Sequence, residues 1–187
     1  MPAPVLGATV EVKVTGIIAR TRVTQIFTNP SQEWLEGVYV FPLPADGAVD
    51  TLRMKVGERT IQGLIQEKEE ARRTYQAACA QGVKAGLVEQ QRPDVFTTKV
   101  ANVGPGETVE VAIELQQVVQ WDRDRFRLRF PMVVDPGEKA AGGGGPPPPP
   151  VRRRGAPPIN PFAFHADLNP GFPLAKVESP SHAVTVV

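Results

Sequence analysis

The chain has 187 residues, 41% of them hydrophobic and 22% charged, and a formal net charge of +1. This length gives one domain or slightly more, and the composition is typical of globular proteins. The basic cluster Arg152–Arg154 follows a proline run and has no interleaved aromatic residues, so we expect no nucleic-acid partner. The sequence as written also predicts no signal peptide and no membrane span, because it has neither a basic segment followed by an apolar one nor a run of about 18 apolar residues.

Cysteine and histidine are too sparse for a metal centre. Cys79 is the one cysteine, so an internal disulfide is excluded, and the two histidines are His165 and His182. No HxxxH or CxxC spacing occurs, and such spacings are what zinc sites require. We therefore expect no metal ion, no cofactor and no small-molecule substrate.

Alternating apolar residues predict strands over most of the chain. Between residues 5 and 65 the alternation includes Val10, Val12 and Val14, which is the period of a half-buried strand. Gly57 stands first in a two-residue loop, as a type II′ hairpin requires.

After residue 94 the same rhythm returns. A tight turn is predicted at 104–106, and the next strand should place one apolar row on a single face, namely Val109, Val111, Ile113 and Leu115. Residues 126–130 again alternate. About nine short strands and one helix near residues 66–82 predict an all-β, mainly antiparallel sandwich or barrel.

The helix is predicted from EKEEARRTYQAACAQG, residues 67–82. Small residues and one aromatic side chain, Tyr75, fall on one face at spacings of three and four. Gly82 suits the left-handed position that ends a helix, and the early glutamates suit its N-terminus. We therefore interpret the helix as a support that packs on a sheet.

A catalytic interpretation of this helix is possible but weaker. Glu67 and Glu70 could form an acid–base pair, with Tyr75 in a hydrolase, or Cys79 could be a nucleophile. A cysteine nucleophile needs a nearby base, and both histidines lie far along the chain. We predict no catalytic, cofactor-binding or metal-binding residues.

The C-terminal part divides into two segments. Residues 135–158 are rich in glycine and proline, which predicts a linker. Residues 159–187 contain an apolar alternation from Phe162 to Leu168, and we expect them to dock on the main domain as β structure. Residues 183–187 also have a strand-like sequence.

Three segments together resemble a known family: GVYVFPLP at 37–44, EKEEARRTYQAACAQGVKAGLV at 67–88 and VFTTKVANVGPGETVEV at 95–111. They are similar to the VIT domain, which is named for vault proteins and inter-alpha-trypsin inhibitor heavy chains. The resemblance covers residues 5–134 and assigns a domain to 1–134. It implies an all-β module with a single helix and no known catalytic residues.

The resemblance extends to bacterial cell-surface proteins sorted by sortase, through residues 159–182. In such proteins the VIT domain precedes a von Willebrand factor A domain, whose Asp-x-Ser-x-Ser loop is missing from this sequence. The implied function is a non-catalytic interaction or scaffolding module of a larger, exported adhesion-type protein. The implied partner is another protein or a neighbouring von Willebrand A domain, and a purely structural spacer is the alternative. The sequence leaves the oligomeric state open.

Overall fold

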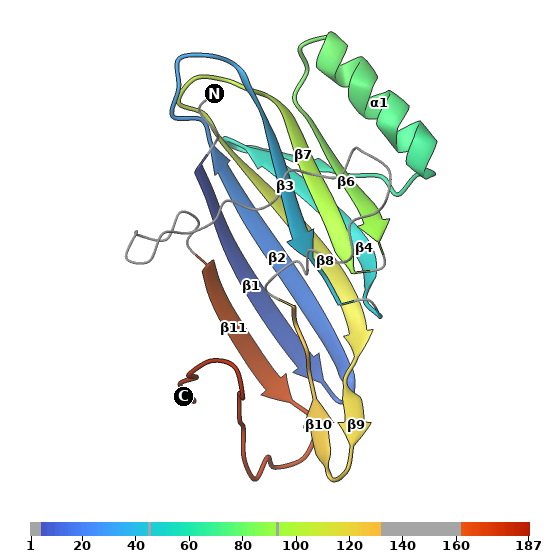
Figure 1. Cartoon of the computed structure of the whole chain (residues 1–187), viewed down its shortest axis with the longest axis vertical. Helices are drawn as coiled ribbons and strands as arrows, with labels where there is room; N and C mark the ends of the chain where they lie inside the picture. Colours follow the sequence, from blue (N-terminus) through green and yellow to red (C-terminus); the bar gives the residue numbers. More distant parts are fainter. Residues whose placement is uncertain (1–4, 45, 93, 132–161) are drawn as a thin grey trace, which may run out of the picture.

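The computed structural model describes residues 5–44, 46–92, 94–131 and 162–187. This part of the chain forms a β-sandwich with one helix on its outside (Figure 1). The elements are β1 (Val5–Thr15), β2 (Ile18–Thr28), β3 (Leu35–Pro42), β4 (Ala48–Val56), β5 (Arg59–Gln62), α1 (Lys68–Ala80), β6 (Ala85–Arg92), β7 (Val95–Val103), β8 (Thr108–Val118), β9 (Gln120–Asp122), β10 (Arg125–Arg127) and β11 (Phe162–Asn169).

Two sheets of unequal size form the sandwich. The larger has six strands in the order β11-β1-β2-β8-β4-β5, and the smaller has three in the order β3-β7-β6. Strands β9 and β10 form a separate hairpin at the lower end of the larger sheet (Figure 1). All pairs are antiparallel except β1 with β11, which run parallel. The predicted all-β fold is confirmed, as an open sandwich rather than a closed barrel.

The core lies between the two sheets and follows the predicted alternation. Strand β8 is central in the larger sheet, and its apolar row is fully buried at Val109, Val111, Ile113 and Leu115. The smaller sheet covers this face through Phe96, Val100 and Val103 of β7. Complete burial of such a side chain contributes roughly 1.5 to 3 kcal/mol to the stability of the fold. Strand β8 therefore forms the centre of the core.

Both predicted tight turns are present. Gly57 has φ +58° in the two-residue loop that joins Val56 to Arg59. Gly106 has φ +68°, and the N–H of Glu107 donates to the carbonyl of Gly104 at 3.1 Å. Glycine adopts these positive φ angles without the steric cost that other residues incur.

The helix is slightly shorter than the predicted 66–82. Gly82 has φ +68°, its N–H donates to the carbonyl of Cys79, and the N–H of Val83 donates to the carbonyl of Ala78. These two hydrogen bonds form the Schellman arrangement that ends many helices. Glu69 and Glu70 lie in the first turn, where the helix dipole favours negative charge.

Strand β11 forms at the predicted alternation and pairs with β1 from Ala8 opposite Phe162 to Thr15 opposite Asn169. Its apolar side chains are less buried than we expected, because β11 is the outermost strand of the sheet. Phe162 and Phe164 are each 41% exposed and Leu168 is 36% exposed. The backbone ladder, more than apolar burial, therefore holds β11 in place.

Of two further strand predictions, one is met only in part and the other is not met. Within 126–130 the ladder stops at Arg127, and Leu128 and Phe130 pack against the core outside any strand. Residues 183–187 form no strand, since no described strand lies beside them to pair with. The predicted linker, 135–158, and its arginine cluster lie outside the described residues.

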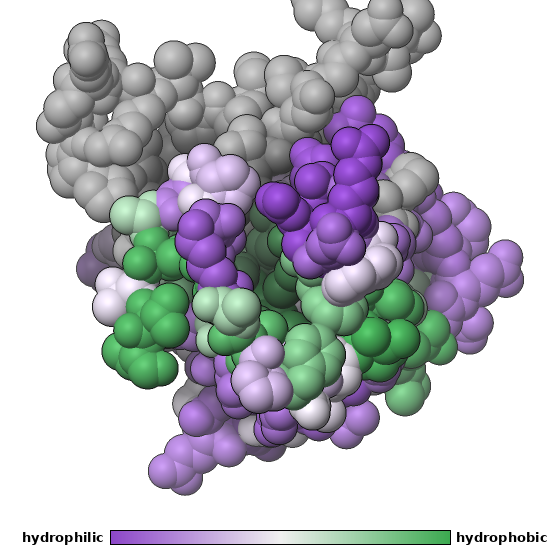
Figure 2. All heavy atoms as spheres, turned by 90° about the horizontal axis from the view of Figure 1, so that it is seen from below, coloured by the Kyte–Doolittle hydropathy of each residue, from purple (hydrophilic) through white to green (hydrophobic). Residues whose placement is uncertain are grey.

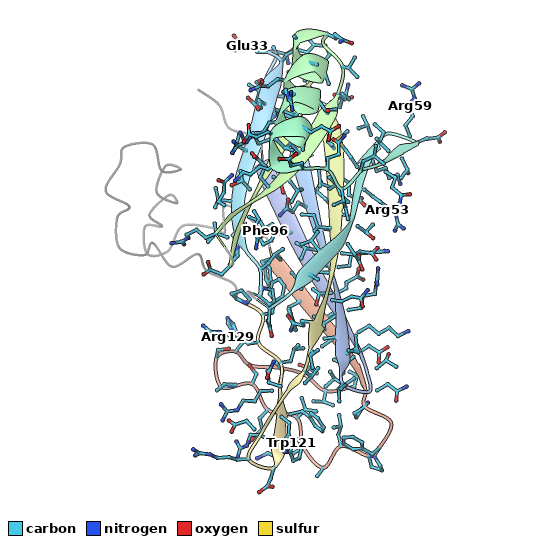
Figure 3. The ribbon with its side chains drawn as sticks, turned by 90° about the vertical axis from the view of Figure 1, so that its right-hand side faces the viewer. Glu33, Arg53, Arg59, Phe96, Trp121 and Arg129 are labelled. Atoms are coloured by element: carbon cyan, nitrogen blue, oxygen red, sulfur yellow. The ribbon has the colours of Figure 1, made fainter. Side chains whose placement is uncertain are left out.

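The outer face of the larger sheet carries an ion-pair network centred on Glu114 of β8. The Glu114 carboxylate accepts hydrogen bonds from Arg20 at 2.8 Å, Arg22 at 2.7 Å and Arg53 at 3.1 Å. Figure 3 shows Arg53 on this side of the sheet. Glu114 is only 7% exposed, and the hydrogen bonds from Arg20 and Arg22 hold the pKa of its carboxyl below its usual range. The network therefore ties β2 and β4 to β8.

We predict that Glu114→Gln lowers the free energy of unfolding by about 1 to 2 kcal/mol at pH 7, because charge-assisted hydrogen bonds are lost. The folded-state pKa of Glu114 is depressed, so its contribution is complete above the unfolded-state pKa and is lost as pH falls through the folded-state pKa. Urea unfolding of the wild type and the variant should therefore show a difference that shrinks below about pH 4.5. Glu110→Gln on the same strand is the matched control, and an equal effect there would contradict a specific role for Glu114.

Candidate interaction surfaces

Helix α1 packs on the outer face of the smaller sheet through a narrow apolar contact. Tyr75 is the one buried residue of the helix, at 8% exposure. It lies against Leu87 of β6 and Ala101 of β7, and Ala71 and Cys79 pack at the edges of this contact. The small residues on either side of Tyr75 let the helix approach the sheet closely.

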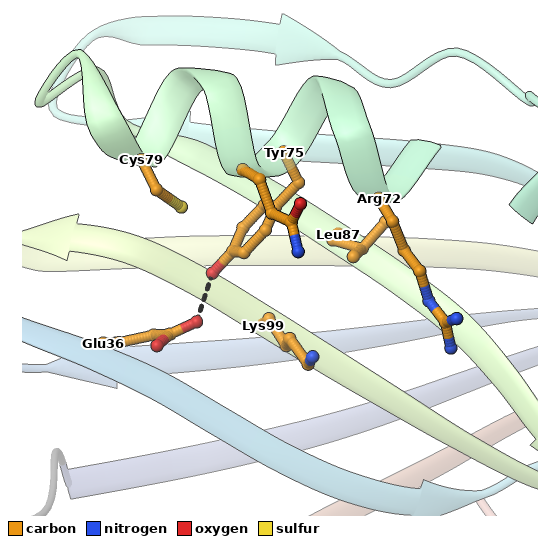
Figure 4. A pocket seen from close by; sticks show the side chains of 7 residues that line it. Glu36, Arg72, Tyr75, Cys79, Leu87 and Lys99 are labelled. Carbon is orange, nitrogen blue, oxygen red and sulfur yellow. Dashed lines mark hydrogen bonds between the residues drawn. The ribbon is translucent and has the colours of Figure 1, made fainter. Parts of the chain in front are cut away.

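The Tyr75 hydroxyl has a carboxylate partner across the sheet. It donates a hydrogen bond of 2.6 Å to Oε1 of Glu36 on β3 (Figure 4). Burial, followed by this hydrogen bond, raises the pKa of Tyr75 far above its ordinary value. The phenol thus stays protonated at physiological pH and acts as a fixed donor that links the helix to β3.

A shallow groove of about 460 Å³ runs beside this contact. It is lined by Glu36, Arg72, Tyr75, Gln76, Cys79, Leu87 and Lys99. A second hollow of about 170 Å³ adjoins it and is also lined by Glu36 and Cys79. Figure 4 shows Arg72, Tyr75 and Cys79 projecting from the helix, with Lys99 and Glu36 on the strands below.

The charges of this groove are already balanced within the protein. The side chain of Glu89 is 3% exposed and accepts a hydrogen bond from Nε of Arg72. The Lys99 ammonium lies 3.8 Å from the other oxygen of Glu89. Arg72 and Lys99 share this buried carboxylate, and Glu36, which also lines the groove, supplies a second negative charge. The groove therefore presents no surplus positive charge to an anionic ligand.

An exposed aromatic cluster lies at the lower end of the sandwich, on the opposite side from α1 (Figures 1 and 3). It consists of Trp121 and Phe126 from the β9–β10 hairpin and Phe172 from the C-terminal tail. The Trp121 and Phe126 rings meet edge to face at 4.7 Å, and Phe126 and Phe172 lie 5.6 Å apart. The three side chains are 61%, 37% and 49% exposed, so the cluster holds large apolar rings together at the surface.

More apolar side chains are exposed close to this cluster. Ile18 of β2 pairs with Val118 of β8, immediately before the hairpin, and these residues are 41% and 50% exposed. Figure 2 views the molecule from this end and shows hydrophobic groups distributed over it between hydrophilic ones. Apolar surface that gathers in this way marks interaction sites more often than chance exposure does.

The family of the chain follows from comparison with known proteins. The model of the Vault protein inter-alpha-trypsin domain (VIT) matches residues 5–115, which is more than half of the chain. The chain belongs to the VIT domain family. The resemblance of the three sequence segments to the VIT domain is thereby confirmed.

Relatives of this VIT domain come from several kinds of protein. It is 38% identical over 112 residues to mouse protein mono-ADP-ribosyltransferase PARP4, which covers 60% of this chain and 6% of that protein. It is 30% identical over 138 residues to human von Willebrand factor A domain-containing protein 5A, covering 72% of this chain and 18% of that protein. It is 28% identical over 118 residues to mouse inter alpha-trypsin inhibitor, heavy chain 4, covering 62% of this chain and 12% of that protein. The chain thus spans less than a fifth of the length of each.

The candidate catalytic residues of the helix are not assembled into a site. Glu67 is the N-cap residue, without a side-chain capping hydrogen bond, and Glu70 lies exposed in the first turn. Tyr75 is buried against the smaller sheet, and its hydroxyl donates a hydrogen bond to Glu36. The structure therefore gives Tyr75 a packing role and leaves the two glutamates in solvent.

Cys79 and the two histidines lie on different parts of the molecule. Cys79 is half-buried in the helix of the VIT domain, whereas His165 lies on β11 and His182 in the tail, both at the opposite side of the fold (Figure 1). Nδ1 of His182 lies 2.9 Å from the Ser181 hydroxyl. Neither histidine is placed to act as a base for Cys79.

Among the described residues, no group of three or more His, Cys, Asp or Glu side chains is arranged to hold a metal ion. None of the described helices is long and apolar enough to cross a membrane.

Sequence reasoning missed the aromatic cluster. The alternation at 126–130 placed Phe126 in one row with Leu128 and Phe130, and Trp121 carried no periodic signal of its own. The dense arginines that flank these aromatic residues are the one feature of the sequence that could have indicated an exposed hairpin.

We predict that Tyr75→Ala lowers the free energy of unfolding by about 3 kcal/mol or more, as loss of a large buried aromatic side chain does. Tyr75→Phe keeps the packing and removes the hydrogen bond to Glu36, so about 1 to 2 kcal/mol should be lost. Urea unfolding is the measurement, and Gln76→Ala on the exposed side of the helix is the control. An unchanged midpoint for Tyr75→Ala would contradict the burial of this face.

Proposed function

We propose that this VIT domain is a non-catalytic protein-interaction and scaffolding module. The observation that carries the proposal is the aromatic cluster of Trp121, Phe126 and Phe172, which is exposed at one end of the sandwich. Tryptophan is strongly enriched among residues that dominate binding energy, and aromatic residues are enriched at interfaces generally. Two of the three rings lie on the paired strands of the β9–β10 hairpin, and a preformed backbone limits the conformational entropy that binding would cost.

The arginines of the hairpin give this surface a charge preference. Arg123, Arg125 and Arg127 of the hairpin and Arg129 just beyond it are all exposed, and Arg127 is paired with Asp122 at 3.1 Å. Their number exceeds that of the aspartates in the hairpin. A partner surface with an apolar centre and acidic surroundings would therefore be complementary in both respects.

The partner that we propose is another protein or a neighbouring von Willebrand A domain of a longer chain. This rests on the names of relatives that contain von Willebrand A domains and on the resemblance to exported, cell-surface adhesion-type proteins. In this arrangement residues 1–134 form the module, 135–158 link it to the C-terminal segment, and 159–187 lead toward the neighbouring domain.

Two other functions are less well supported. A purely structural spacer would need no exposed aromatic cluster, since such a surface has a cost in solubility and a benefit only when it is covered. A hydrolase that uses Glu67, Glu70 and Tyr75 would need these groups to converge, and Tyr75 donates to Glu36 instead.

Affinity capture with the whole chain, from an extract of its source organism, tests the proposal. We predict that the double variant Trp121→Ser, Phe126→Ser reduces the recovery of the specific partner at least tenfold. In calorimetry the purified partner should bind the wild type, and its affinity for the double variant should be at least tenfold lower. Trp34→Ser is the matched control, because Trp34 is 65% exposed but lies beside the α1 groove.

Equal binding by the double variant would contradict the role of the cluster. Loss of binding in Trp34→Ser alone would place the interaction at the groove instead. Turnover in a broad hydrolase screen that disappears in Glu70→Gln would contradict the non-catalytic proposal.

A further inference from the structure

Strand β11 leaves one edge of the larger sheet without a partner among the described strands. It is the outermost strand of its sheet, with β1 on one side (Figure 1). It is eight residues long and pairs with β1 in one continuous register without a bulge. Strand edges of this kind offer a row of N–H and C=O groups to another strand.

The register identifies which backbone groups point outward. The N–H of Gly16, just past β1, donates to the carbonyl of Asn169 at 3.0 Å, so the backbone groups of Asn169 face β1. Successive residues of a strand direct their N–H and C=O groups to opposite sides. The groups of Phe162, Phe164, Ala166 and Leu168 therefore point away from β1, toward the open edge.

The side chains of these same residues form an incompletely covered apolar row. They lie on the face of the sheet that β1 contributes to the core, because Phe164 pairs with Val10 and Leu168 with Val14. Val10 and Val14 are 1% and 6% exposed, whereas Phe164 and Leu168 remain 41% and 36% exposed. The Phe130 ring, 6.2 Å from that of Phe164, covers part of this row. A strand added at the open edge would cover more of the apolar surface that remains exposed.

The edge also lacks the features that prevent strand pairing. Sheet edges are commonly protected by lysine, proline, a bulge or an inward-pointing charge. The β11 sequence, FAFHADLN, contains no lysine or proline. Its titratable side chains, His165 and Asp167, pair with Glu11 and Lys13 of β1. They therefore lie on the solvent-facing side of the sheet, opposite the core, and do not point inward.

We propose that β11 pairs antiparallel with β11 of a second copy of this chain, so that two sandwiches share one continuous sheet. One register satisfies every outward N–H and C=O group: Phe162 lies opposite Leu168 of the other copy, and Phe164 opposite Ala166. A large side chain then meets a small one at the centre. His165 lies opposite its own symmetry mate in a non-hydrogen-bonded pair, and Asp167 lies opposite Ala163.

A second copy fits this edge better than an unrelated strand does, because the sequence is complementary to itself about His165. A two-fold axis at this point gives a closed, isologous dimer in which the β11 edge of each copy is paired. The same register places no two aspartates opposite each other, which would be unfavourable across strands. The oligomeric state thus follows from one strand, independently of the aromatic cluster.

Sedimentation velocity on the whole chain across the micromolar range is the first test. The wild type should show a reversible monomer–dimer equilibrium. Ala166→Pro removes an outward N–H while leaving the bonds to β1 in place, and proline is tolerated at such edge positions. We expect it to raise the dimer dissociation constant at least tenfold with little change in melting temperature.

Disulfide trapping tests the register without relying on a proline. In a Cys79→Ser background, His165→Cys should give a covalent dimer under mild oxidation, because directly opposed residues of an antiparallel pair lie within disulfide reach. Asp167→Cys is the matched control and should crosslink poorly, since its partner is Ala163. A wild type that remains monomeric throughout, or a dimer that is insensitive to Ala166→Pro and crosslinks no better at 165 than at 167, would overturn the proposal.

Discussion

Burial of the inner face of β8 is the interaction on which the rest of this structure depends. Four successive inward side chains of this strand, from Val109 to Leu115, are fully buried, and β2 and β4 are aligned on either side of it. The covering sheet is only half as wide as the sheet that carries β8. This difference in width explains why the apolar core is tightly closed around β8 and β7 but incompletely covered at β11 and at the lower end.

The helix completes the opposite side of the fold. It packs on the outer face of the smaller sheet, where Tyr75 fills the space above Leu87 and Ala101 and fixes β3 through Glu36. Glu89 and Glu36 together offset the charges of the two cations that line the adjoining groove. The helix therefore stabilises the covering sheet, while the aromatic cluster and the β11 edge, where we propose interactions, lie elsewhere on the fold.

The arginines of this protein occur in two different settings, an ion-pair network on the larger sheet and an exposed hairpin at its lower end. On the outer face of the larger sheet, Glu114 pairs with three arginines, two from β2 and one from β4. The β9–β10 hairpin instead presents most of its arginines to solvent, beside exposed aromatic rings. The first arrangement stabilises the sheet through charge-assisted hydrogen bonds, whereas the second would give the interface that we propose a preferred sign of charge.

The sequence by itself determined the local structure. The period of two at Val109 to Leu115, the helical spacing around Tyr75 and the turns at Gly57, Gly82 and Gly106 are properties of neighbouring residues, and each was predicted from them. Only the tertiary structure decided that the apolar row of β11 stays half-exposed and that Trp121, Phe126 and Phe172 meet at the surface. Alternation shows that side chains share a face, but burial depends on how many strands lie on each side and on how far the opposing sheet reaches, and these are fixed by contacts between residues distant in the chain.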